Sequence, residues 1–343
     1  MKRINLALQG GGAHGAFTWG VLDRLLEEED VEIAAISGTS AGALNGAALK
    51  AGLASGGRSQ AREDLEWVWS QVGAVTEPAA QDWLAAMAPS VGLWADLTEA
   101  SPAYQGFDAL ARLTSPYVYG PFFRNPLDRI VRDLRFEHIC ADAGPRLFVG
   151  ATNVRTGKIR IFQGAQITPE AIEASACLPT LFPAIELEDP ATGRREAYWD
   201  GGYTGNPALF PLYAPDLPDD IVIVNINPLV REELPRTAEA ITNRINEISF
   251  NTSLLAELRS IAFVQRLIAT GAVGSGTMKH VKIHMIEDDA LMNELNVATK
   301  TLPQPVILAR LREAGREAAE RFLAAHKRDI GVRGSVDLAG TFS

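Results

Sequence analysis

The sequence INLALQGGGAHG occupies residues 4–15, VEIAAISGTSAG occupies residues 31–42, and these two stretches decide the fold. Each begins with an apolar run that predicts a short strand and continues into a glycine cluster that predicts a tight turn into a helix. The predicted strands are 4–9 and 32–37, and the helices that follow them are about 14–28 and 41–52. This strand–helix order predicts a parallel sheet covered by helices.

The rest of the chain continues the alternation of strand and helix patterns. We expect strands at 146–153, 158–163, 196–199, 221–226 and 280–286, and helices at about 61–72, 126–134, 169–177, 236–270 and 304–326. The chain has 343 residues, of which 47% are apolar and 22% charged, which is typical of a globular protein with a sizeable core.

Composition also limits the classes of partner and the compartment that we expect for this chain. The net charge is −10, which argues against nucleic acid, because neutralising phosphates requires a basic surface. Two cysteines, Cys140 and Cys177, cannot form a disulfide framework and fit a reducing compartment. We find no signal peptide and no apolar run long enough to span a membrane, so we expect a cytoplasmic protein. A peripheral, transient contact with a membrane surface stays open, as does the oligomeric state.

The first glycine cluster allows two interpretations. Gly10, Gly12 and Gly15 match the G-x-G-x-x-G fingerprint of dinucleotide-binding folds. Such a fold uses an acidic residue at the end of the second strand to bind the ribose, and this strand ends in Ile36-Ser37-Gly38 instead. A nucleotide-binding oxidoreductase is therefore kept as the weaker hypothesis.

The second glycine cluster favours the interpretation of the first cluster as an oxyanion hole. Gly38-Thr39-Ser40-Ala41-Gly42 is a G-x-S-x-G nucleophile elbow between a strand and a helix. The glycine loop would lie beside Ser40, because parallel strands end at the same sheet edge. The N–H groups of Gly10, Gly11 and Gly12 could then bind one oxygen, and each such donor is worth roughly 3 kcal/mol.

The base that activates Ser40 must come from elsewhere in the chain. None of the histidines (His14, His138, His280, His284 and His326) lies in a turn that would hold it in a site, although chain order admits His280 or His284 as members of a triad. Asp200 follows a predicted strand and precedes Gly201-Gly202, a turn that would hold a carboxylate rigidly. We therefore expect Asp200 to be the base.

Together these motifs resemble the patatin-like phospholipase family over about residues 4–212. The resemblance rests on Gly10-Gly11-Gly12-Ala13-His14-Gly15, Gly38-Thr39-Ser40-Ala41-Gly42, the segment Ala174–Pro179 with Phe182-Pro183, and Asp200-Gly201-Gly202. One position departs from the family pattern. The family loop often carries Arg or Lys where this chain has His14, which would replace a fixed cation by a group that titrates near neutrality.

The resemblance implies a three-layer α/β/α sandwich with a mainly parallel sheet and extra C-terminal helices. Its hydrolase core would span 4–212 and include a segment, 76–123, that is rich in aromatic residues and prolines. The composition of this segment fits either an acyl pocket or lid, or a packed helical excursion that fills the core. Residues 213–331 would continue the same core, and 332–343 would form a flexible tail.

The resemblance also implies hydrolysis of lipid acyl esters by a Ser40–Asp200 dyad through an acyl-enzyme, with the oxyanion at Gly10 to Gly12. Gly15, Gly38, Gly42, Gly201 and Gly202 would support the motifs. We expect no metal and no cofactor. A catalytically silent module that binds lipid on the same fold is the main alternative, and the acyl substrate stays open among phospholipids, lysophospholipids, neutral lipids and polyesters.

Overall fold

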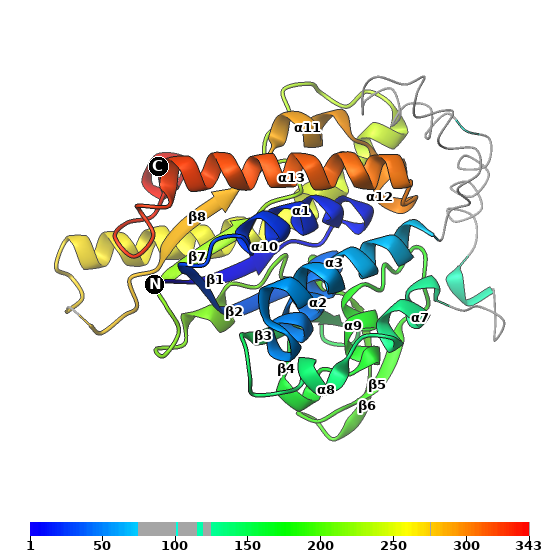
Figure 1. Cartoon of the computed structure of the whole chain (residues 1–343). Coiled ribbons are helices and arrows are strands. Elements are labelled where there is room, and N and C mark those ends of the chain that lie inside the picture. The colour runs from blue at the N-terminus through cyan, green and yellow to red at the C-terminus, as the bar shows by residue number, and fades with distance from the viewer. Residues whose placement is uncertain (75–100, 102–114, 119–124, 275, 343) are drawn as a thin grey trace.

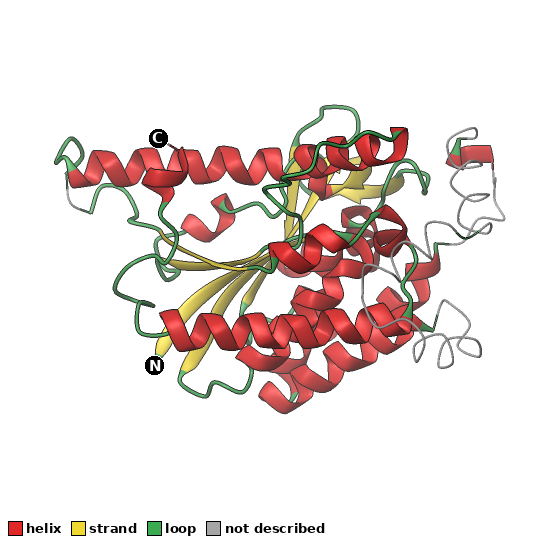
Figure 2. Cartoon of the chain, turned by 90° about the horizontal axis from the view of Figure 1, so that it is seen from above, coloured by secondary structure: helices red, strands yellow, loops and turns green. Residues whose placement is uncertain are grey.

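A mixed sheet with helices on both faces forms the centre of the molecule (Figures 1 and 2). The computed structural model describes residues 1–74, 101, 115–118, 125–274 and 276–342. The strands are β1 (Lys2–Leu8), β2 (Val31–Thr39), β3 (Arg146–Asn153), β4 (Ile159–Gln163), β5 (Ile185–Asp189), β6 (Arg194–Asp200), β7 (Asp220–Val224) and β8 (Lys282–Ile286).

The strand order brings distant parts of the chain together. Among the described residues the sheet has eight strands in the order β5-β6-β3-β2-β1-β7-β8, and β4 pairs with β3. Pairings among β1, β2, β3, β7 and β8 are parallel, whereas those that join β4, β5 and β6 are antiparallel. The predicted α/β class and the largely parallel sheet are confirmed.

Register places three strand ends at one edge of this sheet. Leu8 of β1 lies beside Gly38 of β2, and Thr39 lies beside Gly150 of β3. Asp200, the last residue of β6, lies opposite Ala151. The turns that leave β1, β2 and β6 are therefore neighbours.

The helices cover the sheet on both faces, which Figure 2 shows from above. They are α1 (Gly15–Leu25), α2 (Ala41–Ser55), α3 (Gly57–Gly73), α7 (Pro126–Arg132), α8 (Phe136–Ile139), α9 (Pro169–Ser175), α10 (Ala238–Ala269), α11 (Asp289–Glu294), α12 (Val297–Thr301), α13 (Pro305–His326) and α14 (Leu338–Phe342). No helix of the described residues is both long and apolar enough to cross a membrane.

Alternation along the strands builds two hydrophobic cores, because successive side chains of a strand point to opposite faces. On one face Ile4 and Leu6 of β1 pack in a cluster with side chains of α1, α2, α3 and α13. On the other face Ala7 packs in a cluster with Leu254 and Leu258 of α10. The result is a helix–sheet–helix sandwich. The segment after residue 213 adds β7 and β8 to the sheet, α10 to one face and α13 to the other.

Two further segments had predictions of their own: the aromatic segment 76–123 and the tail after Gly331. Of the aromatic segment 76–123, only residues 101 and 115–118 are described, so the pocket or lid expected there lies largely outside the described residues. The flexibility expected of the tail, 332–343, stays a prediction, and the structure gives this tail defined contacts. The amides of Ser335 and Val336 donate to the carbonyl of Ile283 in β8, and Leu338 is buried against α10.

Candidate active site

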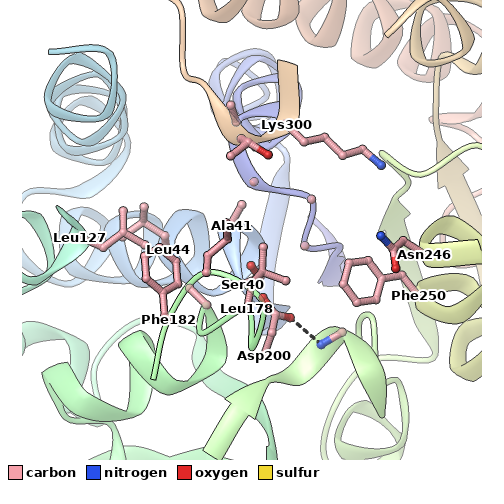
Figure 3. A pocket seen from close by; sticks show the side chains of 18 of the residues that line it. Ser40, Ala41, Leu44, Leu127, Leu178, Phe182, Asp200, Asn246, Phe250 and Lys300 are labelled. Carbon is pink, nitrogen blue, oxygen red and sulfur yellow. Dashed lines mark hydrogen bonds between the residues drawn. The ribbon is translucent and has the colours of Figure 1, made fainter. Parts of the chain in front are cut away.

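A cavity of about 560 Å³ opens where β1, β2 and β6 end, and it brings the predicted site residues together. Ser40, Asp200 and the glycine loop Gly10–Gly12 all line it. Figure 3 shows Ser40 and Asp200 next to each other near the middle of this cavity. Gly202 also lines it, whereas Gly15, Gly38, Gly42 and Gly201 lie behind the wall and support the backbone.

Ser40 sits on a strained turn between β2 and α2. Its φ of 55° and ψ of −122° lie in a region that residues with a side chain rarely adopt, and strain of this kind concentrates at functional sites. The turn requires glycine at Gly42, where a Cβ would run into the carbonyl of Leu8. At Gly38 a Cβ would come within 2.5 Å of the carbonyl oxygen of Gly42. The G-x-S-x-G spacing is thus a packing requirement as well as a motif.

A second serine holds the strained turn in place. The amide of Ser40 donates to Oγ of Ser175 at 2.9 Å, and that hydroxyl donates to the carbonyl of Gly150 at 2.6 Å. Ser175 ends α9 and is fully buried. Sequence reasoning assigned it no role, since nothing local to Ser175 indicates a partner 135 positions away.

Asp200 is buried at the end of β6, with 2% of its surface exposed. Burial raises the pKa of its carboxyl from 3.8 to about 6, while the Gly202 amide and the Ser40 hydroxyl act in the opposite direction through hydrogen bonds. The Gly202 amide lies 2.8 Å from Oδ1. The carboxyl group is therefore ionised at pH 7 but more basic than an ordinary aspartate.

The glycine loop lies directly against Ser40, since a Cβ on Gly10 would come within 2.6 Å of Cβ of Ser40. One contact bears on the expected oxyanion hole, which stays a prediction. The Gly10 amide donates to Oδ1 of Asn206 at 2.6 Å, so it already has an acceptor. The amides of Gly11 and Gly12 have no acceptor among the described residues. Gly12 has a φ of 58°, which glycine adopts without steric cost.

Buried amide side chains hold the glycine loop. Asn206 donates to the Gly10 carbonyl at 3.3 Å, and Asn227 donates to it at 2.8 Å. Oε1 of Gln9 accepts from the amides of Ile226 and Asn227 at 2.8 and 3.1 Å. Gln9, Asn206 and Asn227 are fully buried, so these bonds are protected from water. The sequence analysis did not predict this network, because its members lie about 200 positions apart in the chain.

None of the described histidines lines the cavity, which argues against a triad. His284 is buried between Asp220, 3.0 Å from its Nε2, and Ser335, 3.2 Å from its Nδ1. This serine–histidine–aspartate set joins the C-terminal segment to β7 and β8, and it lies away from the cavity.

His14 is buried beside the glycine loop. Nε2 of His14 lies 2.8 Å from Oγ1 of Thr299, whose hydroxyl proton goes to the carbonyl of Asn296. Nε2 must therefore donate, which assigns the ring proton from the network. Burial, and then Lys300 and Arg231, hold the pKa of His14 well below 6.5. The expectation that this residue titrates near neutrality is wrong, because the folded protein keeps it uncharged.

The cavity has an apolar side and a polar side, with Ser40 between them (Figure 3). Figure 3 shows Leu44, Leu127 and Phe182 on one side, and Lys300, Asn246 and the ring of Phe250 on the other. Such a division suits an amphipathic ester, whose hydrocarbon chain and polar portion need different surroundings. Among the described residues no group of three or more His, Cys, Asp or Glu side chains is arranged to hold a metal ion.

Comparisons with known proteins bear on this fold and site. A family model described as patatin-like phospholipase matches residues 6–213. Among solved structures the chain is similar to VipD from Legionella pneumophila, at 16% sequence identity and a TM-score of 0.41. That match covers 95% of this chain and 67% of the VipD chain. A search of curated proteins finds no match.

Proposed function

Because the chain belongs to the patatin-like phospholipase family, whose model covers more than half of its length, we propose that it cleaves lipid acyl esters by means of Ser40 and Asp200. Family membership implies lipid acyl hydrolase activity in general. The proposal adds the residues: Ser40 is the nucleophile, Asp200 the base, and the amides of Gly11 and Gly12 are the oxyanion donors.

The reaction begins with proton transfer from Ser40. The Asp200 carboxylate accepts the hydroxyl proton while Oγ of Ser40 bonds to the ester carbonyl carbon. A pKa of about 6 supports this role, since such a group is ionised at pH 7 and is a stronger base than an exposed aspartate. No histidine is needed between the two side chains, which is consistent with the absence of histidine from the described cavity wall.

The amides of Gly11 and Gly12 stabilise the negative oxygen that forms on the former carbonyl. Each donor aimed at this oxygen is worth about 3 kcal/mol of transition-state stabilisation, provided that it is held in position beforehand. Gly10 contributes differently from the sequence-based expectation, because its amide and carbonyl anchor the loop to Asn206 and Asn227. The anchored loop then needs little reorganisation during the reaction.

The cycle closes through an acyl-enzyme. Protonated Asp200 donates its proton to the alcohol oxygen as the bond from that oxygen to the carbonyl carbon breaks, and the acyl group stays esterified to Ser40. A water molecule then gives a proton to Asp200 while its oxygen attacks the acyl carbon. The fatty acid leaves as Oγ of Ser40 takes the proton back. Asp200 thus acts as base and acid in forming the acyl-enzyme, and again as base and acid in hydrolysing it.

The observation that carries the proposal is the meeting of Ser40 and Asp200 in one cavity, where their side chains interact. The test is hydrolysis of short and medium p-nitrophenyl esters by wild type, Ser40→Ala, Asp200→Asn and the double variant. We expect each single variant to lose about a thousandfold in kcat or more, and the double variant to be little worse than either. Wild-type rates in both single variants would reject the dyad.

A fluorophosphonate probe separates the alternatives, because it reacts covalently with an activated serine. We expect it to label the wild type and to spare Ser40→Ala. A protein that binds liposomes but resists the probe would be a catalytically silent lipid-binding module. Saturable binding of NADH or FAD, measured by fluorescence, would instead favour the nucleotide hypothesis for Gly10–Gly15.

A further inference from the structure

Three cations surround one buried carboxylate, Glu247, which lines the polar side of the cavity together with Lys300. Glu247 of α10 has 1% of its side chain exposed. Arg231 binds it with two hydrogen bonds of 2.7 and 2.8 Å, while Arg244 lies at 3.3 Å and Nζ of Lys300 at 3.8 Å. Within this cluster one carboxylate faces three cations, and Asp289 also interacts with Arg231. Burial lowers the pKa of Lys300, Glu247 raises it and Arg231 lowers it further.

Lys300 is the member of this cluster that can offer its charge to a ligand. Among the described residues that line the cavity, Lys300 is present, whereas Arg231 and Arg244 are not. Arg231 and Arg244 also donate to backbone carbonyls, those of Asn293, Pro228 and Leu229. An ammonium group has three N–H donors, and Oδ1 of Asn227 accepts one of them at 3.2 Å. Donor capacity therefore remains, on a side chain that is only 18% exposed.

The backbone of Lys300 is anchored to the glycine loop. A Cβ on Gly12 would run into the carbonyl of Lys300, so α12 packs directly on the loop. The neighbouring Thr299 is held by His14 at 2.8 Å. Figure 3 shows the Lys300 side chain extending from this anchor on the same side as Asn246, away from Leu44 and Leu127. A fixed backbone and a nearly buried stem place the ammonium group at a defined position.

This arrangement indicates which end of an ester Lys300 would meet. With the acyl chain on the apolar side and its carbonyl at Ser40, the alcohol portion points to the polar side. We propose that Lys300, together with the Asn246 amide on the same side of the cavity, binds a phosphate group on the alcohol portion of the substrate. Lys300 is then the residue that makes the enzyme prefer phosphorylated over neutral acylglycerols. The inference rests on the proposed hydrolase function, and it assigns that specificity to a residue outside the matched region 6–213.

The test compares two substrates that differ only in the phosphate: 1-decanoyl glycerol and 1-decanoyl glycerol 3-phosphate, both below their critical micelle concentrations. The readout is the ratio of kcat/KM for the phosphorylated ester to that for the neutral ester. We expect Lys300→Met to lower this ratio at least about tenfold, as is typical for losing one hydrogen bond to a charged group. Lys300→Arg should keep most of the ratio. Lys158→Met, which removes an exposed lysine outside the cavity, should leave it at the wild-type value.

A binding measurement separates failure of this inference from failure of the hydrolase proposal. Calorimetric titration of Ser40→Ala with 1-decanoyl glycerol 3-phosphate needs no turnover. Weaker binding on adding Lys300→Met would support the phosphate site even if no ester were cleaved. An unchanged ratio together with unchanged binding, in a Lys300→Met protein that melts like the wild type, would overturn the inference. The remaining contacts of Arg231 and Arg244 keep Glu247 paired in that variant, so we expect it to fold.

Discussion

The amide nitrogen of Gly10 donates a hydrogen bond of 2.6 Å to Oδ1 of Asn206, which lies 196 positions further along the chain. The same asparagine donates back to the Gly10 carbonyl at 3.3 Å. This reciprocal pair ties the loop that faces Ser40 to the segment that follows Asp200. In the proposed mechanism Gly10 therefore anchors the loop, and Gly11 and Gly12 supply the oxyanion donors.

Replacing Asn206 should therefore damage catalysis through the loop. In Asn206→Ala the buried Gly10 amide loses its acceptor, at a cost of about 1–3 kcal/mol. We expect a melting temperature several degrees lower and, at a temperature where the variant is folded, a kcat reduced about tenfold or more, as a displaced oxyanion loop would cause. Asn293→Ala, at an exposed asparagine outside the cavity, is the control. An unaltered kcat in Asn206→Ala would show that the loop holds its position without this bond.

Ser175 should matter for the conformation of Ser40. Ser175→Ala removes the acceptor of the Ser40 amide and leaves that buried N–H group unpaired. We expect kcat to fall by about one to two orders of magnitude, because the strained turn is no longer held, while KM changes little. Steady-state kinetics on a p-nitrophenyl ester measure both constants. Ser70→Ala, at an exposed serine of α3, is the matched control, and equal kcat values for the two variants would contradict the prediction.

The pH dependence of the reaction should report Asp200. A base must be ionised, and burial raises the pKa of this carboxyl to about 6. We expect kcat/KM to be constant above about pH 7 and to fall tenfold per pH unit well below pH 6, since kcat/KM follows the free enzyme. A non-ionisable ester removes any contribution from the substrate. An acid limb centred near pH 4 would mean that Asp200 titrates like an exposed aspartate.

The same shift in pKa makes a prediction about stability. A folded-state pKa of about 6, against 3.8 for an ordinary aspartate, means that the folded protein binds the proton more tightly than the unfolded chain does. The contribution of Asp200 to stability is thus largest below pH 3.8, and it declines as pH rises to 6. Two pKa units correspond to about 3 kcal/mol.

Asp200→Asn removes this ionisation while keeping the shape of the side chain. The difference in unfolding free energy between the variant and the wild type should increase by up to about 3 kcal/mol in favour of the variant between pH 4 and pH 7. Urea denaturation at both pH values measures it. Asp142→Asn, at an exposed aspartate, should show no comparable change. An inactive Asp200→Asn protein with increased stability at pH 7 would be the signature of a functional group that costs stability.

Much of the fold followed from local signals. The apolar runs at 4–9 and 32–37 became β1 and β2, and the long periodic pattern at 236–270 became α10 within two residues at each end. These predictions succeeded because an element with one buried face has apolar side chains at a regular spacing along its own sequence. The contacts of the C-terminal tail could not be predicted, for the converse reason. Its small and polar residues form no periodic pattern that would predict the contact of Leu338 with α10.

The candidate site also combines features that the local sequence predicts with features that depend on long-range contacts. By itself the sequence determined the turn at Ser40, the glycine loop and the Asp200 turn, because each depends on backbone conformations and close approaches that only certain residues permit at a given spacing. Only the tertiary structure decided that Ser175 holds Ser40, that Asn206 occupies the Gly10 amide, that His14 stays neutral and that Lys300 reaches the cavity. Those contacts join residues far apart in the chain. Neither end carries a local constraint, so the packing of the sheet and helices had to bring them together.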